Sequence, residues 1–164
     1  MATQVQFRRG TTSQHGSFTG AVGEVTVDTD KDTVVVHDGS QAGGFAIPNL
    51  KTAQEFTKTQ NFNATTLSDG ATIAWDASSN QVAKVTLGGN RTLAAATNQV
   101  DGAVYVLSVI QDGSGSRTLS FNSNYKFTGG TAPTLTTTAS AIDVLVFLSN
   151  GSNMLEIGRS LNVS

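Results

Sequence analysis

Two nearly continuous apolar runs constrain most strongly what this 164-residue chain can fold into. They are Ala103–Ile110 and Ile142–Leu148, and both are rich in β-branched residues. Runs of this length and kind are typical of β-strands that are covered on both faces. A single chain of this size can cover one face by packing two sheets together. Coverage of the second face therefore suggests a neighbouring subunit.

The composition agrees with a protein built from strands and tight turns. Only 13% of the residues are charged, whereas 23 threonines and 16 serines make up about a quarter of the chain. Low charge with recurring apolar runs is not typical of disorder, and the residues that favour helices do not dominate. The sequence therefore predicts an all-β protein.

Shorter segments also have strand character, separated by turn signals. Val25–Val27 and Val34–Val36 predict two strands joined by a polar turn, and alternation over Gln81–Leu87 predicts a half-buried antiparallel strand. Asp-Gly and Asn-Gly pairs supply the positive φ values of tight turns. These pairs are Asp38-Gly39, Asp69-Gly70, Asp101-Gly102, Asp112-Gly113 and Asn150-Gly151.

A polar segment at residues 49–64 divides the chain. Its apolar residues are widely spaced and fit neither a helix nor a strand, so we expect a linker. It separates an N-terminal β module at residues 1–48 from a C-terminal module at residues 65–164. A module of 48 residues is too small for a comfortable core of its own, which favours oligomerisation.

Charge and cysteine content exclude several classes of function. The net charge of −2 gives no surplus of basic residues for nucleic acid or an anionic membrane. Without cysteine there are no disulfides, thiolate zinc sites or cysteine nucleophiles. Residues 1–10 do not read as a signal peptide, and no apolar run is long enough to span a bilayer. We therefore expect neither nucleic acid nor membrane as a partner.

The N-terminal module resembles a known family. Its segments Phe7–Thr12, Gly23–Asp28 and Val35–Gly39, followed by Gly43-Gly44, match the order and spacing of a module at the N-terminus of many phage tail fibres. The named relative is the N-terminal domain of the major tropism determinant proteins. The segments Leu67–Asp76, Leu87–Leu93, Gly102–Leu107, Gln111–Leu119 and Gly129–Leu135 resemble a β-sandwich module that is widespread in phage fibre and virion surface proteins.

These resemblances imply a non-enzymatic structural protein of a phage particle. They imply a jelly-roll-like β-sandwich after the small N-terminal module, intertwined as a homotrimer, with no cofactor and no bound metal. The protein would be made in the host cytoplasm and mounted on the virion surface through its N-terminal module, against capsid or tail proteins. Because no shaft repeat or tip is visible, capsid decoration is slightly favoured. The alternative is a short tail fibre or tail adaptor that contacts host-surface carbohydrate.

We expect several residues to lie at a trimer or virion interface. An arginine of the Arg8-Arg9 pair can bridge carboxylates through its bidentate fork, with Glu24 as the acidic partner. The alternative is a pair of solvated arginines on an edge strand. The full set of interface candidates is Arg8, Arg9, Gly10, Thr11, Glu24, Asp38, Gly39, Trp75 and Tyr105.

For several other residues we prefer a structural role to a functional one. Trp75 and Tyr105 lie in strand segments, where such side chains belong to a core or an interface more often than to a sugar site. The spacing of Asp28, Asp30 and Asp32 matches the beginning of a calcium-binding EF-hand loop. The residues at the later positions of that loop do not match, so a polar turn is predicted. The two histidines fit no catalytic or zinc spacing, and His37 is expected in a turn or at the surface, whereas His15 carries no prediction.

Two other classes of function remain open. A carbohydrate-binding module would use the loops Asp112–Arg117 and Gly129–Pro133. A depolymerase would need two convergent carboxylates, such as Asp69 and Asp76, and spacing alone does not exclude that pair. A chain with so few charged residues offers little material for such a site.

Overall fold

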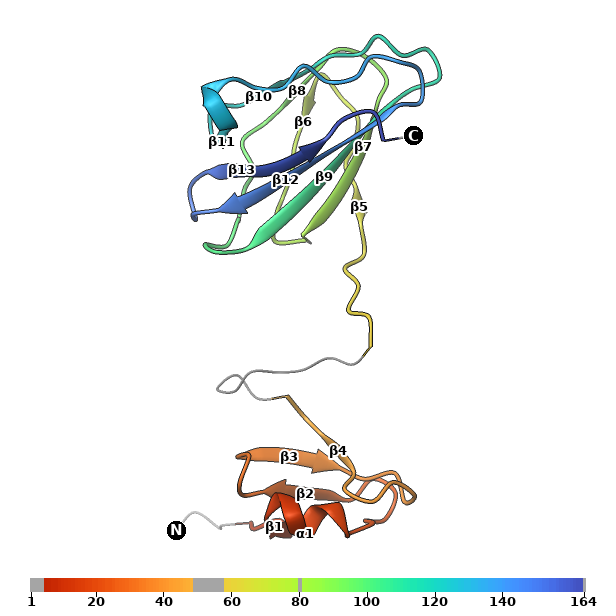
Figure 1. The fold of residues 1–164 in the computed structure, drawn as a ribbon, viewed down its shortest axis with the longest axis vertical. Helices are drawn as coiled ribbons and strands as arrows, with labels where there is room; N and C mark the ends of the chain where they lie inside the picture. Colours follow the sequence, from red (N-terminus) through yellow and green to blue (C-terminus); the bar gives the residue numbers. More distant parts are fainter. Residues whose placement is uncertain (1–4, 49–57, 80, 164) are drawn as a thin grey trace. The chain divides into compact units, whose positions relative to one another are not determined.

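The computed structural model describes residues 5–48, 58–79 and 81–163. By compactness it divides the chain into two units, Met1–Gln60 and Asn61–Ser164. Strands dominate both units (Figure 1), which confirms the all-β class. The expected linker at residues 49–64 lies mostly outside the described residues, which resume at Lys58.

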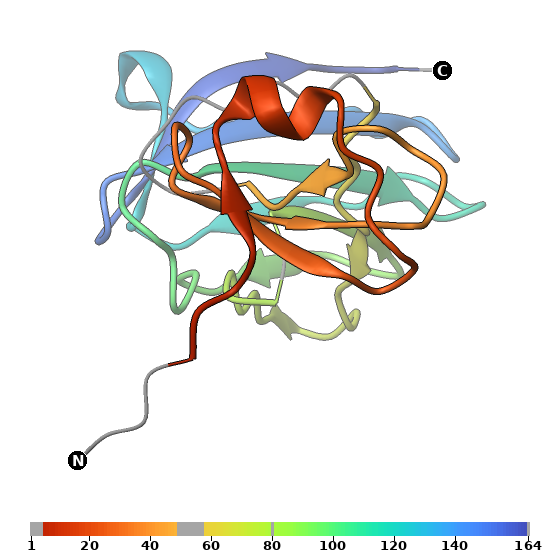
Figure 2. The same cartoon turned by 90° about the horizontal axis from the view of Figure 1, so that it is seen from below.

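The N-terminal unit is a four-stranded sheet with one short helix. The strand order is β1-β2-β3-β4, and β2 and β3 form the antiparallel hairpin that the valine-rich segments predict. Figure 2 shows α1 lying across one face of this sheet. The elements are β1 (Arg9–Gly10), α1 (Thr12–Gly16), β2 (Val25–Asp28), β3 (Thr33–Val36) and β4 (Phe45–Ala46).

Sequence reasoning missed the helix α1, although a local signal for it exists. Thr11 caps the helix: its side chain accepts the N–H of Gln14, and the Gln14 side chain accepts the N–H of Thr11. This reciprocal pair is a capping box, and its T-x-x-Q pattern is visible in the sequence. The helix carries His15 into the interior of the unit, where it is 6% exposed.

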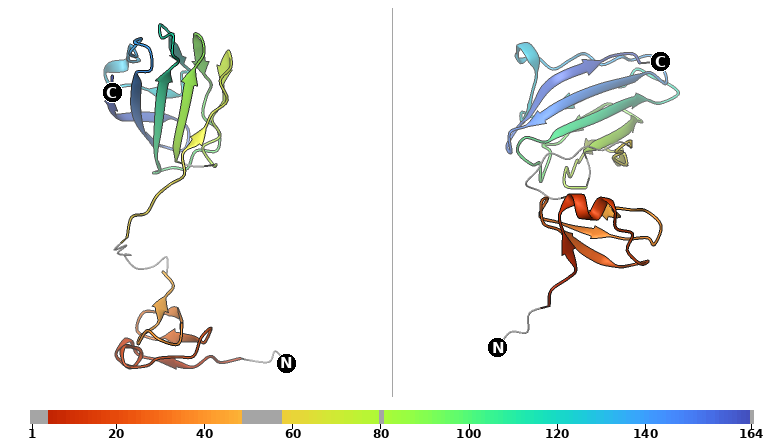
Figure 3. Two further views of the ribbon diagram at one scale, coloured as in Figure 1. Left: turned by 90° about the vertical axis from the view of Figure 1, so that its right-hand side faces the viewer. Right: turned by 60° about the horizontal axis from the view of Figure 1, so that its bottom comes forward.

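The C-terminal unit contains two sheets. The six-stranded sheet has the order β11-β13-β12-β9-β7-β5, and the three-stranded sheet has the order β10-β8-β6. Figure 3 shows β13, β12, β9 and β7 side by side. The strands are β5 (Thr65–Thr66), β6 (Thr72–Ile73), β7 (Val82–Leu87), β8 (Arg91–Leu93), β9 (Val104–Gln111), β10 (Leu119–Phe121), β11 (Tyr125–Lys126), β12 (Ile142–Ser149) and β13 (Met154–Ser160), with a 3₁₀ turn at Thr128–Gly130.

The first six strands of this unit wind back and forth between the two sheets. β5, β7 and β9 are parallel neighbours in the larger sheet, and β6, β8 and β10 are parallel neighbours in the smaller one. The prediction of an antiparallel strand at residues 81–87 is therefore wrong, because β7 runs parallel to both of its neighbours. Alternation reports which face of a strand is buried, but it does not report strand direction. The antiparallel part of the larger sheet is β9-β12-β13.

The core lies between the two sheets. Ile73, Leu93 and Leu119 from the smaller sheet meet Leu107 and Leu145 from the larger one, and all five are buried. Aromatic side chains continue this core toward β11 and β13 through edge-to-face contacts. The unit therefore has a single hydrophobic core, which it completes within one chain.

The two apolar runs bury only one of their faces within the chain. Along β9 and β12, every second residue is buried, and the residues between them are half-buried or exposed. The expectation that both faces are covered is therefore not met by the single chain. Coverage of the second face by a neighbouring subunit stays a prediction.

Candidate functional site

One face of the N-terminal sheet is apolar and open to solvent in the single chain. Cross-strand register places Val36 between Val25 and Phe45. The next row contains Val27 and Val34, and the carbonyl of Val34 accepts the N–H of Ile47. The N-terminal apolar face is defined by Val25, Val27, Val34, Val36, Phe45 and Ile47.

This face is too apolar for a surface in permanent contact with water. Phe45 is 54% exposed and Ile47 is 50% exposed, while Val34 and Val36 are each 38% exposed. A half-solvated antiparallel sheet normally directs polar side chains outward. Contiguous exposed apolar side chains indicate a surface that is covered by another protein.

The opposite face of the same sheet is buried and mostly polar. It carries Thr26, Asp28, Thr33 and His37 around one apolar residue, Val35, and all five are buried in the N-terminal unit. The ring of His15, on α1, stacks on the ring of His37, with 6.3 Å between the two ring centres. His37 is 2% exposed, so the expectation of a turn or surface histidine is wrong. Its place at the end of a valine strand brings its side chain to the inward face.

Thr26 joins the two histidines in a continuous chain of hydrogen bonds. Its hydroxyl oxygen lies 2.8 Å from Nε2 of His15 and 2.9 Å from Nε2 of His37. Nδ1 of His15 lies 3.0 Å from the carbonyl oxygen of Thr11, so that nitrogen is the donor. Nδ1 of His37 accepts the N–H of Gly20 at 3.3 Å.

These partners assign a consistent direction to the whole chain of hydrogen bonds. With both rings neutral, His15 donates from Nδ1 and accepts the Thr26 hydroxyl hydrogen at Nε2. Thr26 in turn accepts the hydrogen on Nε2 of His37. Each buried donor and acceptor is then used once, which is the arrangement that buried polar groups require. The histidines therefore serve to hold α1 on the sheet.

Asp28 fixes the turn after β2 in a similar way. Its carboxylate accepts the hydroxyl of Thr12 at 2.7 Å and the backbone N–H groups of Asp30 and Lys31. Burial acts to raise the pKa of Asp28, but these hydrogen bonds outweigh it and lower the pKa below its usual 3.8. Among the described residues, no group of three histidine or acidic side chains is arranged to hold a metal ion.

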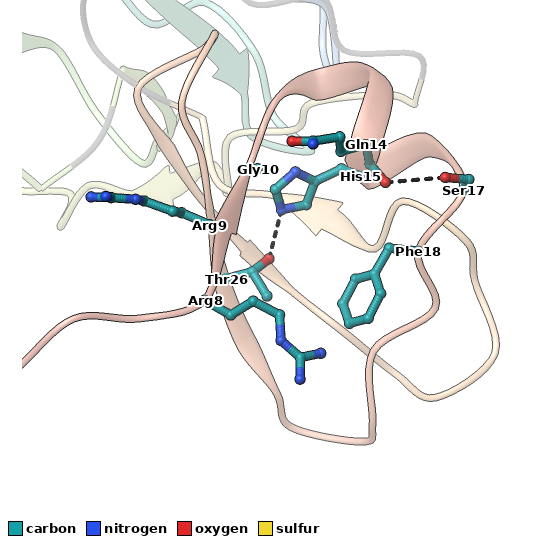
Figure 4. A pocket seen from close by; sticks show the side chains of 8 residues that line it. All are labelled: Arg8, Arg9, Gly10, Gln14, His15, Ser17, Phe18 and Thr26. Atoms are coloured by element: carbon teal, nitrogen blue, oxygen red, sulfur yellow. Dashed lines mark hydrogen bonds between the residues drawn. The ribbon is translucent and has the colours of Figure 1, made fainter.

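Arg8 and Glu24 form an ion pair within one chain. The guanidinium lies 2.9 Å from the Glu24 carboxylate and 4.9 Å from the centre of the Phe18 ring. Figure 4 shows the adjoining pocket of about 360 Å³, which Arg8 and Phe18 line together with His15 and Thr26. The Arg8 side chain is 61% exposed, so the pair contributes little stability. A role for these residues between subunits stays a prediction.

Arg9, Gly10 and Thr11 lie at the edge of the sheet. Arg9 is in register with Val27, which places it beside the N-terminal apolar face. No ion pair involves Arg9 among the described residues. A side chain at Gly10 would come within 3.0 Å of the Gln14 side chain, so glycine is needed where β1 passes under α1.

Asp38 and Gly39 form the predicted tight turn. The Asp38 carboxylate accepts the N–H groups of Ser40 and Gln41, and Gly39 has a φ of +82°. The same hydrogen bonds, with that from Gln41 the strongest, lower the pKa of Asp38. The function of this pair in the single chain is local.

Trp75 and Tyr105 lie inside the C-terminal unit. They are 2% and 1% exposed, and their rings pack edge to face at 5.9 Å. The Tyr105 hydroxyl also accepts the N–H of Val100. As residues of this core they do not reach the surface of the single chain.

An open hollow of about 810 Å³ lies beside Tyr105. Exposed Phe62 lines it, together with neutral side chains that include Asn61, Asn63, Ser78 and Gln81. An aromatic ring surrounded by amides and hydroxyls can stack on a sugar and hydrogen-bond to its hydroxyl groups. The candidate loops at residues 112–117 and 129–133 contain no aromatic residue.

The loops at residues 69–70 and 112–117 are held by two arginine–aspartate pairs. Arg91 contacts both oxygens of Asp69 at 2.6 and 2.8 Å, and Arg117 binds one oxygen of Asp112 through two nitrogens. The guanidinium of Arg91 lowers the pKa of Asp69, and that of Arg117 lowers the pKa of Asp112. These carboxylates are therefore ionised structural groups.

Asp69 and Asp76 do not converge as a pair of catalytic carboxylates would. Asp69 follows β5 and pairs with Arg91, whereas Asp76 follows β6 and accepts hydrogen bonds from Ser78 and Asn98. Figure 1 shows that the ends of β5 and β6 point toward opposite ends of the C-terminal unit. The structure therefore gives no support to the depolymerase alternative.

Sequence reasoning missed the N-terminal apolar face and the Thr26 hydrogen bonds. The signal was present only in part, because Thr26 and Asp28 alternate with the valines of β2, whereas β3 has valine on both of its faces. Alternation separates two faces but does not tell which of them is covered. Here the short helix covers the polar face, against the usual expectation.

Replacing Thr26 by valine tests the histidine–threonine chain. Thr26→Val removes the partner of both Nε2 atoms, and we expect the N-terminal unit to lose on the order of 1–3 kcal/mol of unfolding free energy. Amide hydrogen exchange over residues 5–48 measures this loss. Thr19→Val is the matched control, because the Thr19 side chain is exposed and takes no part in the hydrogen bonds through Thr26. Equal protection in the two variants would contradict the assignment.

Comparisons with known proteins agree with both modules. The family described as "Major tropism determinant N-terminal domain" matches residues 5–41, and the family described as "Putative phage tail fibre C-terminal domain" matches residues 67–154. The "Tail fiber receptor-binding protein" of Bordetella phage BPP-1 is 53% identical over 75 residues, which are 39% of this chain. The chain spans about a fifth (20%) of the length of that relative.

Solved structures of major tropism determinant variants are also similar. The M1 variant is 69% identical, with a TM-score of 0.27, over 27% of this chain and 12% of its own. The U1 variant is 33% identical, with a TM-score of 0.31, over 88% of this chain and 38% of its own.

The family matches distinguish between the two hypotheses for this virion protein, capsid decoration and a tail fibre or tail adaptor. Both matching families concern tail fibres or tropism determinants, so they support the tail-fibre alternative and give no support to capsid decoration. Among the described residues, no helix is long and apolar enough to cross a membrane. The second family match covers more than half of the sequence, so the chain belongs to the family of the phage tail fibre C-terminal domain and is a component of the phage particle surface.

Proposed function

We propose that this protein is a non-enzymatic subunit of a phage tail fibre or tail adaptor, and that it works as a homotrimer. In this proposal the N-terminal module joins the three chains and attaches them to the tail. The C-terminal module then faces outward as the part that meets the host. The mechanism is mechanical, because the chain offers packed sheets and hydrogen-bonded turns.

The observation that carries this proposal is the N-terminal apolar face. It occupies two full rows of a four-stranded sheet whose other face is already filled by α1. A module this small buries too little apolar surface to be comfortable alone. Covering the face with the same face of two further chains would give the module the hydrophobic core that it lacks.

Assignment to the tail rests on the relatives. The proteins and families that match are named for tail fibres, receptor binding and tropism. Since the chain spans only a fifth of the curated relative, receptor binding by this chain is itself part of the proposal. If the protein were found on the capsid, capsid decoration would replace the tail assignment.

Locating the protein on the intact particle tests the proposal. We expect cryo-electron microscopy or immunogold labelling of purified virions to place it at the tail, because the matching families are tail proteins. Labelling of an unrelated major capsid protein serves as the control for position. Copies distributed over the capsid surface would contradict the tail assignment and restore the decoration hypothesis.

A charge on the N-terminal apolar face tests the homotrimer. Analytical ultracentrifugation should give the wild-type chain a mass of three times 17.0 kDa. Phe45→Lys should raise the concentration at which the trimer dissociates at least tenfold, because a buried unpaired lysine costs several kcal/mol per subunit. Gln41→Lys adds the same charge to an exposed loop of the same unit and should dissociate as the wild type does. A monomeric wild type, or a Phe45→Lys chain that dissociates at the wild-type concentration, would contradict the proposal.

Binding of host-surface carbohydrate is a second candidate function. The hollow beside Phe62 favours it, since that ring is 61% exposed and is surrounded by neutral amides and hydroxyls. A glycan array of host polysaccharides should show binding that Phe62→Ala reduces at least tenfold. Val22→Ala is the control, because Val22 is an exposed aliphatic residue of the N-terminal unit and lies outside the proposed trimer interface. No binding at high concentration would remove this function.

A further inference from the structure

The larger sheet of the C-terminal unit also leaves an apolar face uncovered. The outward positions of β9 and β12 carry seven aliphatic side chains and Ser108. We name these seven the C-terminal apolar face: Val104, Val106, Ile110, Ile142, Val144, Val146 and Leu148. Val104 is 42% exposed, and the others are half-buried only by contact with one another and with the flanking strands.

The flanking strands extend this face. Val82 of β7 lies in register with Val106, and Leu155 of β13 lies in register with Leu148. Ile157 occupies the irregular position in β13, where the register shifts, and is 56% exposed. The smaller sheet and the core occupy the opposite side of the larger sheet. Within the described residues of the C-terminal unit, no further element covers this side.

We propose that the C-terminal apolar face packs against a second copy of this chain. The inference rests on the homotrimer proposed above and adds to it a second interface, in the other unit. No charged residue occupies an outward position on β9 or β12, and Lys84 of the flanking β7 lies beside Ser108 at the edge of the face, so the centres of two identical faces meet without repulsion. Depletion of charge and a high aliphatic content are typical of the buried centre of permanent homo-oligomeric interfaces.

The size of the face argues against coverage by the chain's own N-terminal module. β9 and β12 have eight residues each, so the face is about 26 Å long at 3.3 Å per residue. The longest strands of the N-terminal sheet have four residues, or about 13 Å. The N-terminal apolar face is thus about half as long as the surface it would have to cover.

The presence of two uncovered faces also favours a second copy over another virion protein. Each of the two units leaves one apolar sheet face open, so a single chain carries two such faces. A second copy supplies both surfaces in equal amount and at the moment of synthesis. It also protects long aliphatic strands from irregular association before the particle is assembled.

A single cysteine tests this interface, because the chain has no natural cysteine. Val144→Cys places a thiol of similar volume at the centre of the face. Thr72→Cys is the matched control, on the exposed outer side of the smaller sheet. We expect a thiol reagent to label Val144→Cys at least tenfold more slowly than Thr72→Cys in the native full-length protein. Both should react equally in denaturant.

A second variant links protection to association. Val144→Lys should raise the concentration at which the oligomer dissociates at least tenfold, while Thr72→Lys should not. The fluorescence of Trp75, the chain's one tryptophan, reports whether the C-terminal unit of each variant is folded. If Val144→Lys does not fold, the labelling of Val144→Cys alone decides.

Each other outcome overturns the inference in a distinguishable way. Fast labelling of Val144→Cys in a chain of trimeric mass would overturn it and leave the homotrimer standing. Slow labelling in a chain of monomeric mass would assign the covering surface to the same chain. Fast labelling in a monomeric chain would overturn both this inference and the homotrimer.

Discussion

Each sheet of this protein buries one of its two faces within the chain. The side chains on the second face determine how the protein can assemble. In the C-terminal unit the inner faces of two sheets close a single core around Leu107, Leu145 and Ile73. In the N-terminal unit a helix of five residues closes the inner face. The outer faces of the N-terminal sheet and of the six-stranded sheet are apolar where an isolated domain would carry polar side chains, whereas the three-stranded sheet has a polar outer face. A protein arranged in this way is suited to assembly.

The N-terminal module shows this division most clearly, because its polar and apolar faces are exchanged. Its interior is held by hydrogen bonds through His15, Thr26 and His37, and by the Asp28 turn. Hydrogen bonds contribute modestly to stability but impose strict geometry. The hydrophobic effect, which is the larger source of stability, is left available to the outer face. This is the physical basis for our proposal that the module joins three chains through its apolar face.

The C-terminal unit, in contrast, closes its hydrophobic core within one chain and has firmly held loops. Two arginine–aspartate pairs fix the turns that follow its parallel strands. The side chain of Gln111 is buried and bonds to backbone groups of both Arg117 and Thr136, which ties two loops to the end of β9. Loops fixed in this manner suit an exposed fibre domain, since they resist unfolding and proteolysis.

The sequence alone determined the fold class, the hairpin of β2 and β3, and the strand character of both apolar runs. These features follow from local rules of composition, alternation and turn chemistry. The resemblance of residues 7–44 and 67–135 to phage fibre modules pointed to the virion, and the family matches agree. The capping box of α1 was equally local and could have been read from Thr11 and Gln14.

Only the tertiary structure decided which faces are buried. Alternation in β2 separates Val25 and Val27 from Thr26 and Asp28, yet nothing in it tells that the polar side lies inside. Direction was also undecided, because β7 has the same pattern whether its neighbours run parallel or antiparallel. The same limit applied to Trp75 and Tyr105, whose burial depends on the opposing sheet. Burial and direction are set by the partner that packs against a strand, and that partner lies far away in the sequence.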